Sequence, residues 1–270
     1  MAEPFRSPLA TDANAGLVVL VTGGGTGLGR AVAREFAHTG ASLAIAGRRP
    51  EPLEEVRAEL EHAGADCLAS PADVREPDQV AALVDAVLER FGRIDVLVNN
   101  AGGQFVAQPE NISAKGWRAV HRLNVDAVWE LTRTVAERSM IPNRGGLVVF
   151  VGFSPRRGIP LMVHSSAARA ALENLAGGLA IEWSRHRIRA VCVATGAIDT
   201  QAFRDYGEDF VNEATRTTPL GRIATPEEVA SVIAFLSTSG GAFITGTTIV
   251  VDGGNDAWGL GFPPPQPAEP

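Results

Sequence analysis

A glycine-rich segment follows the first strongly apolar run of the chain. Residues 22–29 read Thr-Gly-Gly-Gly-Thr-Gly-Leu-Gly and lead into a stretch of helical periodicity. Glycines at these spacings permit a tight turn, and they let backbone N–H groups approach a pyrophosphate at the positive end of a helix. We therefore expect a dinucleotide site whose phosphate-binding residues are Gly23, Gly25, Thr26, Gly27, Leu28 and Gly29.

Two arginines stand where the second apolar run ends. Arg48 and Arg49 follow Gly47, at the place where a dinucleotide fold meets the adenosine ribose. A carboxylate there would bind the 2′-hydroxyl of NAD, whereas arginines favour the 2′-phosphate of NADP(H). The alternative is a pair of solvated loop arginines in an arginine-rich chain. Asp73 and Val74, after the third apolar run, are expected to hydrogen-bond the adenine.

These residues need a scaffold of alternating strands and helices. The expected strands are 17–22, 42–47, 66–70, 95–99, 146–152, 188–194 and 247–251. The expected helices are a stretch that follows the glycine-rich residues and ends at 39, and then 51–63, 78–91, 113–140, 165–185 and 226–237. This alternation predicts an α/β fold, a single doubly wound Rossmann domain with a mainly parallel seven-stranded sheet and helices on both faces. We expect the domain to span 16–259, between a flexible N-terminal arm (1–15) and a Pro-rich C-terminal tail (260–270).

The composition is that of a globular protein, with 45% apolar and 20% charged residues among 270. A net charge of -7 argues against a nucleic acid partner, because phosphate backbones require a basic face. The longest apolar run is strand-sized, and the N-terminus lacks the order of a secretory signal. Cys67 and Cys192 fall in separate apolar strands, which is typical of buried thiols in a reducing compartment. We predict a cytoplasmic protein without a membrane partner and assign no metal ligands.

Further motifs complete a family pattern. Asn99-Asn100-Ala101-Gly102 follows the fourth strand, Asn124 lies in a long helix, and Asp252-Gly253-Gly254 closes the last strand. With the glycine-rich turn, these motifs resemble the short-chain dehydrogenase/reductase family across nearly the whole chain. The resemblance implies that Asn99 or Asn100 ties neighbouring strands together. It also implies a nicotinamide end of the cofactor site that comprises Asn100, Ala101, Gly102, Gly196, Ile198 and Thr200.

The catalytic positions depart from the family pattern. Members carry a serine and then Tyr-x3-Lys, in which the tyrosine exchanges a proton while the lysine lowers its pKa and holds the ribose. Residues 169–172 read Arg-Ala-Ala-Leu and match the family's Lys-Ala-Ala-Leu, so Arg169 replaces the lysine, Ser165 the tyrosine and Gly152 the serine. The i,i+4 spacing keeps Ser165 and Arg169 on one helical face. An arginine can hold ribose hydroxyls but is a poor proton relay, and serine lacks the acidity of a phenol.

Reduction of a C=C bond conjugated to a thioester demands less of a proton donor than ketone reduction does. Hydride adds at the β-carbon, hydrogen bonds stabilise the resulting enolate, and water can protonate the α-carbon. A closer resemblance supports this chemistry, because residues 99–105, 112–117 and 163–169 are similar to the peroxisomal trans-2-enoyl-CoA reductase branch. The candidate catalytic residues are Asn124, His164, Ser165, Arg169 and Tyr206.

Two of these candidates have a structural alternative. Tyr206 is the only tyrosine, and the resemblance identifies 201–218 as a mobile substrate loop. The favoured interpretation is that Tyr206 packs this loop or contacts an acyl chain. For His164, the favoured interpretation is a residue at the helix start or at the rim of the site.

Three functional hypotheses follow. The first is an NADPH-dependent oxidoreductase that reduces the C=C bond of a 2-enoyl-CoA or a similar activated enone, with an acyl-CoA thioester as its small-molecule substrate. The second is a carbonyl or alcohol oxidoreductase with an atypical site, and the third is a non-catalytic NADP-binding subunit. The matched motifs favour the first. The resemblance also implies a homotetramer built on the helices 113–140 and 165–185 and on the last strand.

Overall fold

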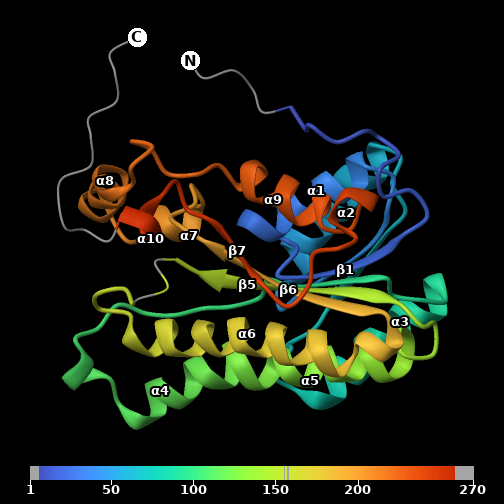
Figure 1. Ribbon diagram of the computed structural model, residues 1–270, viewed down its shortest axis with the longest axis horizontal. Helices are drawn as coiled ribbons and strands as arrows, with labels where there is room; N and C mark the ends of the chain where they lie inside the picture. Colours follow the sequence, from blue (N-terminus) through green and yellow to red (C-terminus); the bar gives the residue numbers. More distant parts are fainter. Residues whose placement is uncertain (1–5, 155, 157, 259–270) are drawn as a thin grey trace.

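The computed structural model describes residues 6–154, 156 and 158–258, which form one sheet between two layers of helices (Figure 1). The strands are β1 (Val18–Thr22), β2 (Ser42–Gly47), β3 (Cys67–Pro71), β4 (Val96–Asn99), β5 (Gly146–Phe153), β6 (Ile188–Thr195) and β7 (Thr248–Val251). The helices are α1 (Gly27–His38), α2 (Pro50–His62), α3 (Pro77–Phe91), α4 (Ala114–His121), α5 (Ala127–Val135), α6 (Val163–Glu182), α7 (Gln201–Arg204), α8 (Glu208–Thr217), α9 (Pro226–Phe235) and α10 (Asn255–Trp258).

The seven strands pair in the order β3-β2-β1-β4-β5-β6-β7, and every pairing is parallel. The predicted doubly wound fold with a mainly parallel seven-stranded sheet is therefore confirmed. Strands β1 and β4 are buried at every position, because helices cover both faces, and this explains their continuous apolar sequence. The chain reverses its direction of travel across the sheet between β1 and β4. In such sheets the crevice at this reversal, at the carboxyl ends of the strands, is where ligands bind.

Two hydrophobic cores lie on opposite faces of the sheet. Helices α1, α2 and α9 cover one face, and α3, α5 and α6 cover the other (Figure 1). Alternate residues of β1 serve the two cores, since Val19 and Val21 pack with α1 while Leu20 packs on the opposite side. Helices α7, α8 and α10 gather beyond the carboxyl end of the sheet (Figure 1).

Two details of the helices position the site. A π-helical turn, Arg122–Asp126, joins α4 to α5, so the expected helix 113–140 is continuous through it. Helix α6 begins at Val163, two residues before the expected start, because the Met162 carbonyl accepts hydrogen bonds from the N–H groups of Ser165 and Ser166. His164 and Ser165 therefore belong to the first turn of α6.

The described part of the expected N-terminal arm packs against the domain instead of extending from it. Asn14 is 1% exposed, and its amide donates to Thr39 Oγ1 at 2.9 Å and accepts from Ser237 Oγ at 2.7 Å. These bonds fasten the segment between the ends of α1 and α9. The Pro-rich tail at 260–270 lies outside the described residues. No helix within the described ranges is long and apolar enough to cross a membrane.

Candidate active site

The glycine-rich turn joins β1 to α1 in a tight backbone conformation that leaves no room for side chains at Gly23 and Gly29. Gly23 and Gly27 have φ of +67° and +52°, in the left-handed region that favours glycine. A Cβ on Gly23 would lie 2.8 Å from the Asn100 amide nitrogen, and one on Gly29 would collide with the Gly23 carbonyl. Thr26 precedes α1, and its side chain makes no capping hydrogen bond. The turn thus leaves the N-terminus of α1 open to an anion.

The loop after β4 is tied to the end of β1. Thr22 Oγ1 accepts hydrogen bonds from the N–H groups of Asn100 and Ala101, both at 3.0 Å. The Asn100 side-chain amide donates to the Thr22 carbonyl at 2.8 Å, and the Asn99 amide donates to Thr132 Oγ1 at 3.0 Å. Both asparagines therefore use their side chains to hold neighbouring elements together.

Asn124 and Arg169 hold the same loop from below the sheet. Asn124 is fully buried, and its amide donates to the carbonyls of Gly103 and Val120, both at 2.8 Å, and accepts from the Gly103 N–H at 3.3 Å. A Cβ on Gly102 would lie 2.8 Å from Asn124 Oδ1 and would collide with the Arg169 guanidinium. Because its amide is engaged by backbone, Asn124 positions the loop and has no donor to spare for a substrate.

Ser165 and Arg169 lie one turn apart on α6 and face this loop. Arg169 Nη1 donates to the Val151 carbonyl, and its Nε is buried with no partner among the described residues. Burial lowers the pKa of Arg169 to about 10, so the group stays charged at neutral pH. Ser165 is fully buried. The same-face placement expected from their spacing is what the structure has.

A side chain at Gly152, the position of the family's serine, would crowd the neighbouring strand. A Cβ on Gly152 would lie 2.6 Å from Cys192 Sγ on the neighbouring strand β6. A serine would therefore require Cys192 to move. Burial raises the pKa of Cys192 to about 12, so its thiol is neutral and fills space.

Gln104, which was not among the predicted site residues, connects two of the candidate catalytic residues. Ser165 Oγ donates to Gln104 Oε1 at 3.5 Å, and Gln104 Nε2 donates to Tyr206 Oη at 3.3 Å. Tyr206 comes from the segment between α7 and α8, where its ring packs against Phe203 and Phe210. The signal that could have identified Gln104 is its place directly after the Gly102-Gly103 pair.

His164 is buried beside these groups but makes no polar contact. Its ring lies 4.3 Å from the Phe105 ring, centroid to centroid, and neither ring nitrogen has a partner in the described part of the chain. Burial, with a smaller contribution from His121, lowers the pKa of His164. The imidazole is therefore neutral at neutral pH.

The loop after β6 lies against the glycine-rich turn. Thr200 caps the N-terminus of α7, and its methyl group would be 3.3 Å from a Cβ on Gly27. Ile198 is 9% exposed, and Gly196 packs against Asp252 at the end of β7. The residues expected at the nicotinamide end therefore come from loops that meet at the carboxyl edge of the sheet.

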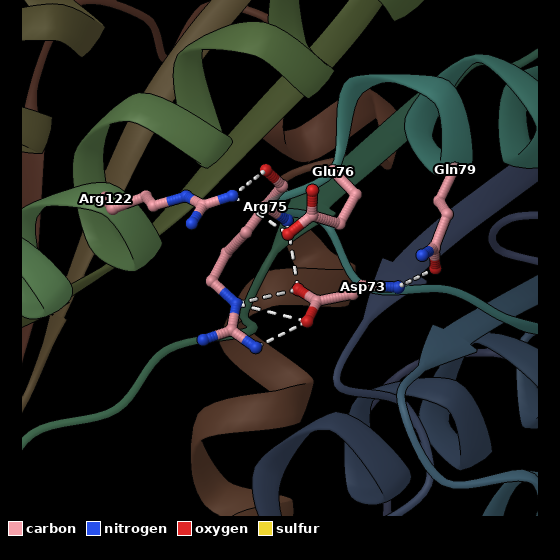
Figure 2. Close-up of polar contacts among 5 residues, drawn as sticks. All are labelled: Asp73, Arg75, Glu76, Gln79 and Arg122. Atoms are coloured by element: carbon pink, nitrogen blue, oxygen red, sulfur yellow. Dashed lines mark hydrogen bonds and ion pairs between the residues drawn. The ribbon is translucent and has the colours of Figure 1, made fainter.

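Figure 2 shows the hydrogen-bonded cluster at the expected adenine end. Both carboxylate oxygens of Asp73 accept from the Arg75 guanidinium, with Nε at 2.9 and 3.1 Å, while the Asp73 N–H donates to Gln79 Oε1 at 2.8 Å. Arg122 donates to Glu76 at 2.8 Å and to the Arg75 carbonyl at 3.2 Å. The Arg75 hydrogen bonds lower the pKa of Asp73 to about 2. The carboxylate is thus ionised and oriented, but any adenine would share it with Arg75.

Arg48 and Arg49 lie at the carboxyl end of β2. Both are exposed, and their side chains have no hydrogen-bond or ion-pair partner within the described ranges. Arg49 directly precedes α2, and Arg48 adds a smaller electrostatic contribution to the lowered pKa of Asp73. The two guanidinium groups are therefore free to meet an anion at this end of the site.

The neutral, unpartnered His164 predicts a pH-dependent stability. A buried histidine with a lowered pKa binds its proton less readily in the folded state, so stability is greatest above its ordinary pKa of about 6.5 and falls as the pH drops below it. In His164→Phe, which keeps a flat ring against Phe105, this part of the acid destabilisation should vanish. Denaturant unfolding of both proteins at several pH values measures it. A stability difference between them that is the same at every pH would contradict the prediction.

The chain is similar to known proteins over most of its length. The family model described as Enoyl-(Acyl carrier protein) reductase matches residues 23–256. A probable 2,4-dienoyl-CoA reductase of Caenorhabditis elegans, named as (3E)-enoyl-CoA-producing, is 35% identical over 95% of this chain and 86% of the relative. A peroxisomal 2,4-dienoyl-CoA reductase of Pongo abelii, also named as (3E)-enoyl-CoA-producing, is 32% identical over 96% and 89%.

One solved structure is similar to the chain in both fold and sequence. The citronellol catabolism dehydrogenase AtuB of Pseudomonas aeruginosa superposes with a TM-score of 0.84 at 35% identity, and the match covers 93% of this chain and all of that one. The relatives confirm the expected resemblance to a branch of acyl-CoA double-bond reductases, with 2,4-dienoyl-CoA rather than 2-enoyl-CoA in their names. On these matches and on the parallel sheet with its glycine-rich turn, the chain belongs to the short-chain dehydrogenase/reductase family of oxidoreductases.

Proposed function

We propose that this chain is an NADPH-dependent reductase of a C=C bond conjugated to the thioester carbonyl of an acyl-CoA. The proposal rests on the two residues that α6 carries at the positions of the family's tyrosine and lysine, near Gly102. Ser165 and Arg169 stand where a phenol and an ammonium group would serve ketone reduction. Arginine stays protonated and serine lacks the acidity of a phenol, so neither is suited to delivering a proton to an alkoxide.

Reduction of the conjugated double bond avoids that demand. NADPH, when bound, supplies the hydride. Addition at the end of the conjugated system breaks the C=C π bond, and the electron pair moves to the thioester oxygen. Hydrogen-bond donors stabilise this enolate, and water gives a proton to the α-carbon. The net change is one hydride and one proton added, without a side-chain acid. The candidate donors to the thioester oxygen are the hydroxyl groups of Ser165 and Tyr206, which lie on either side of Gln104.

The residues that would hold the dinucleotide fit it at three places. The glycine turn 23–29 leaves room for a pyrophosphate at the start of α1. Arg169 carries a buried Nε without a partner, close to Gly102, and ribose hydroxyls would supply acceptors for it. Arg48 and Arg49, which have no partner among the described residues, lie at the end of β2, where a 2′-phosphate would lie.

The relatives support the substrate class. The names of the C. elegans and P. abelii proteins describe reduction of a 2,4-dienoyl-CoA to a (3E)-enoyl-CoA, which is the same conjugate addition carried over one more double bond. The name of AtuB favours a second candidate, a carbonyl or alcohol oxidoreductase with an atypical site. A cytoplasmic location and a homotetramer stay predictions.

A panel of substrates tests the function. With NADPH, the protein should reduce 2-enoyl-CoA and 2,4-dienoyl-CoA thioesters at least about a hundredfold faster than 3-oxoacyl-CoA or simple ketones, because loss of a positioned acid costs roughly that much. Loss of NADPH absorbance and the masses of the products measure it. Faster turnover of the ketones would favour the second candidate. Tight NADPH binding without turnover of any substrate would favour a non-catalytic subunit, and both outcomes would contradict the proposal.

The two arginines at the end of β2 should set the cofactor preference. The double variant Arg48→Ala/Arg49→Ala should lose about tenfold or more in NADPH affinity while NADH affinity stays constant, since charge-assisted bonds to phosphate contribute roughly 1.5–3 kcal/mol. Arg57→Ala is a matched control, because Arg57 lies on α2 but is paired with Glu54 and Glu61. Equal affinity of the unmodified protein for NADPH and NADH would count against the proposal.

Arg169 should act on both nicotinamide cofactors, because they share the ribose that it would hold. Arg169→Ala should weaken NADPH and NADH binding alike, by about tenfold or more. Arg169→Lys should restore binding without creating ketone reduction, since Ser165 still stands at the tyrosine position. Titration of cofactor fluorescence measures binding, and thermal unfolding monitors the fold. Unchanged affinity in a folded Arg169→Ala protein would show that Arg169 does not hold the ribose.

A further inference from the structure

Gln104 lies between the hydroxyl groups of Ser165 and Tyr206. Its Oε1 faces Ser165 Oγ on α6, and its Nε2 faces Tyr206 Oη on the segment between α7 and α8. The three side chains come from three separate parts of the chain, and all are half-buried or fully buried. A single carboxamide therefore connects the catalytic helix to the segment that follows β6.

The two ends of a carboxamide differ chemically. The oxygen can only accept a hydrogen bond, and the nitrogen can only donate one. A hydroxyl that faces the oxygen therefore uses its proton on Gln104, whereas one that faces the nitrogen keeps its proton for another acceptor. In the orientation of the structure, Ser165 uses its proton and Tyr206 keeps its own.

We propose that Gln104 is a positioning residue that makes the Tyr206 phenol the hydrogen-bond donor to the substrate's thioester oxygen. The inference rests on the proposed function and specifies which side chain stabilises the enolate. The phenol that α6 lacks at position 165 is thereby replaced by one from a different segment. Tyr206 donates a hydrogen bond and keeps its proton, while the α-carbon is protonated by water, so the balance of the reaction is unchanged.

The surroundings of Gln104 suit this role. The preceding residue, Gly103, is held through both its N–H and its carbonyl by the buried Asn124, which anchors the backbone of the loop. The Tyr206 ring packs 5.2 Å from the Phe210 ring and 6.2 Å from the Phe203 ring, centroid to centroid. These contacts within its own segment of the chain orient the phenol. The two hydrogen bonds of Gln104 are long, and such contacts commonly tighten when substrate binds.

Replacement of the amide by a carboxyl group tests the proposal. In Gln104→Glu, the carboxylate can only accept, so it takes the protons of both hydroxyls and leaves no donor for the substrate. Turnover of the conjugated acyl-CoA should fall on the order of a hundredfold where the carboxyl is ionised, with little change in KM. It should recover as the pH is lowered, because a protonated carboxyl again has one donor and one acceptor. A pH profile of kcat parallel to that of the wild type would overturn the proposal.

Two matched variants isolate the effect. Gln104→Met keeps the length of the side chain without hydrogen bonds, so its turnover should fall without the recovery at low pH. Gln108→Glu adds the same charge at an exposed position of the same loop and should keep the wild-type profile. The neighbouring titratable groups His164, Arg169 and Tyr206 are present in all four proteins. Because a carboxylate at position 104 can favour protonation of the nearby imidazole, the Gln104→Glu profile is measured in the His164→Phe background as well, where the recovery at low pH should persist. NADPH affinity and thermal unfolding, unchanged in all variants, would show that the fold and cofactor site are intact.

The choice between the two hydroxyls has its own test. Tyr206→Phe keeps the ring and its packing and should lower kcat by about a hundredfold, whereas Ser165→Ala should lower it much less. A collapse of kcat in Ser165→Ala with near-normal turnover in Tyr206→Phe would overturn the assignment of the phenol. Failure of the proposed function is distinguishable, because the wild type itself would then leave conjugated acyl-CoA thioesters unreduced.

Discussion

The close passage of the loop after β4 between Thr22 and α6 governs the geometry of the whole site. Thr22 accepts two N–H groups of this loop at one end, and Asn124 holds Gly103 near the other. Between them, Gly102 passes so close to Arg169 that a side chain at that position would displace the guanidinium. This fit determines the direction of the Arg169 side chain and the direction in which the Gln104 side chain points toward Ser165. It also determines the space left for a cofactor.

The buried imidazole and the buried guanidinium of the site both lie on α6. In the part of the chain that the structure describes, the buried side-chain nitrogens without a partner belong to His164 and Arg169, both in the first two turns of α6. Buried polar groups are normally satisfied, so the clustering of these two agrees with the proposal that cofactor or substrate binds here. The two residues differ in kind, because His164 avoids the cost of burial by staying neutral, whereas Arg169 remains a cation. A helix that offers a fixed cation, and no acid at positions 165 and 169, is suited to stabilising negative charge on an oxygen and poorly suited to delivering a proton.

Much of this arrangement could be predicted from the sequence, because it depends on local patterns. Continuous apolar runs predicted the strands of a sheet covered on both faces, and the i,i+4 spacing placed Ser165 and Arg169 on one face of α6. The remaining features depend on distances between segments. The Gln104–Tyr206 contact joins residues that are 102 positions apart, so no local pattern indicates it. The Arg75 guanidinium that occupies the Asp73 carboxylate was likewise not predicted, because the sequence indicated only an adenine contact for Asp73.

The π-helical turn Arg122–Asp126 connects the two ends of the candidate cofactor site, because it contains a residue that contacts each end. Arg122 bonds the Arg75 carbonyl and Glu76 beside the adenine end, and Asn124, two residues later, holds the loop that carries Gln104. A π turn contains one residue more than regular helical geometry requires. Removal of that residue would rotate α4 against α5 by about 100°, the angle that one residue spans in an α-helix. Arg122 and Asn124 could then no longer reach both loops, so the poorer hydrogen bonding of the π turn is offset by the contacts that it makes possible at both ends of the site.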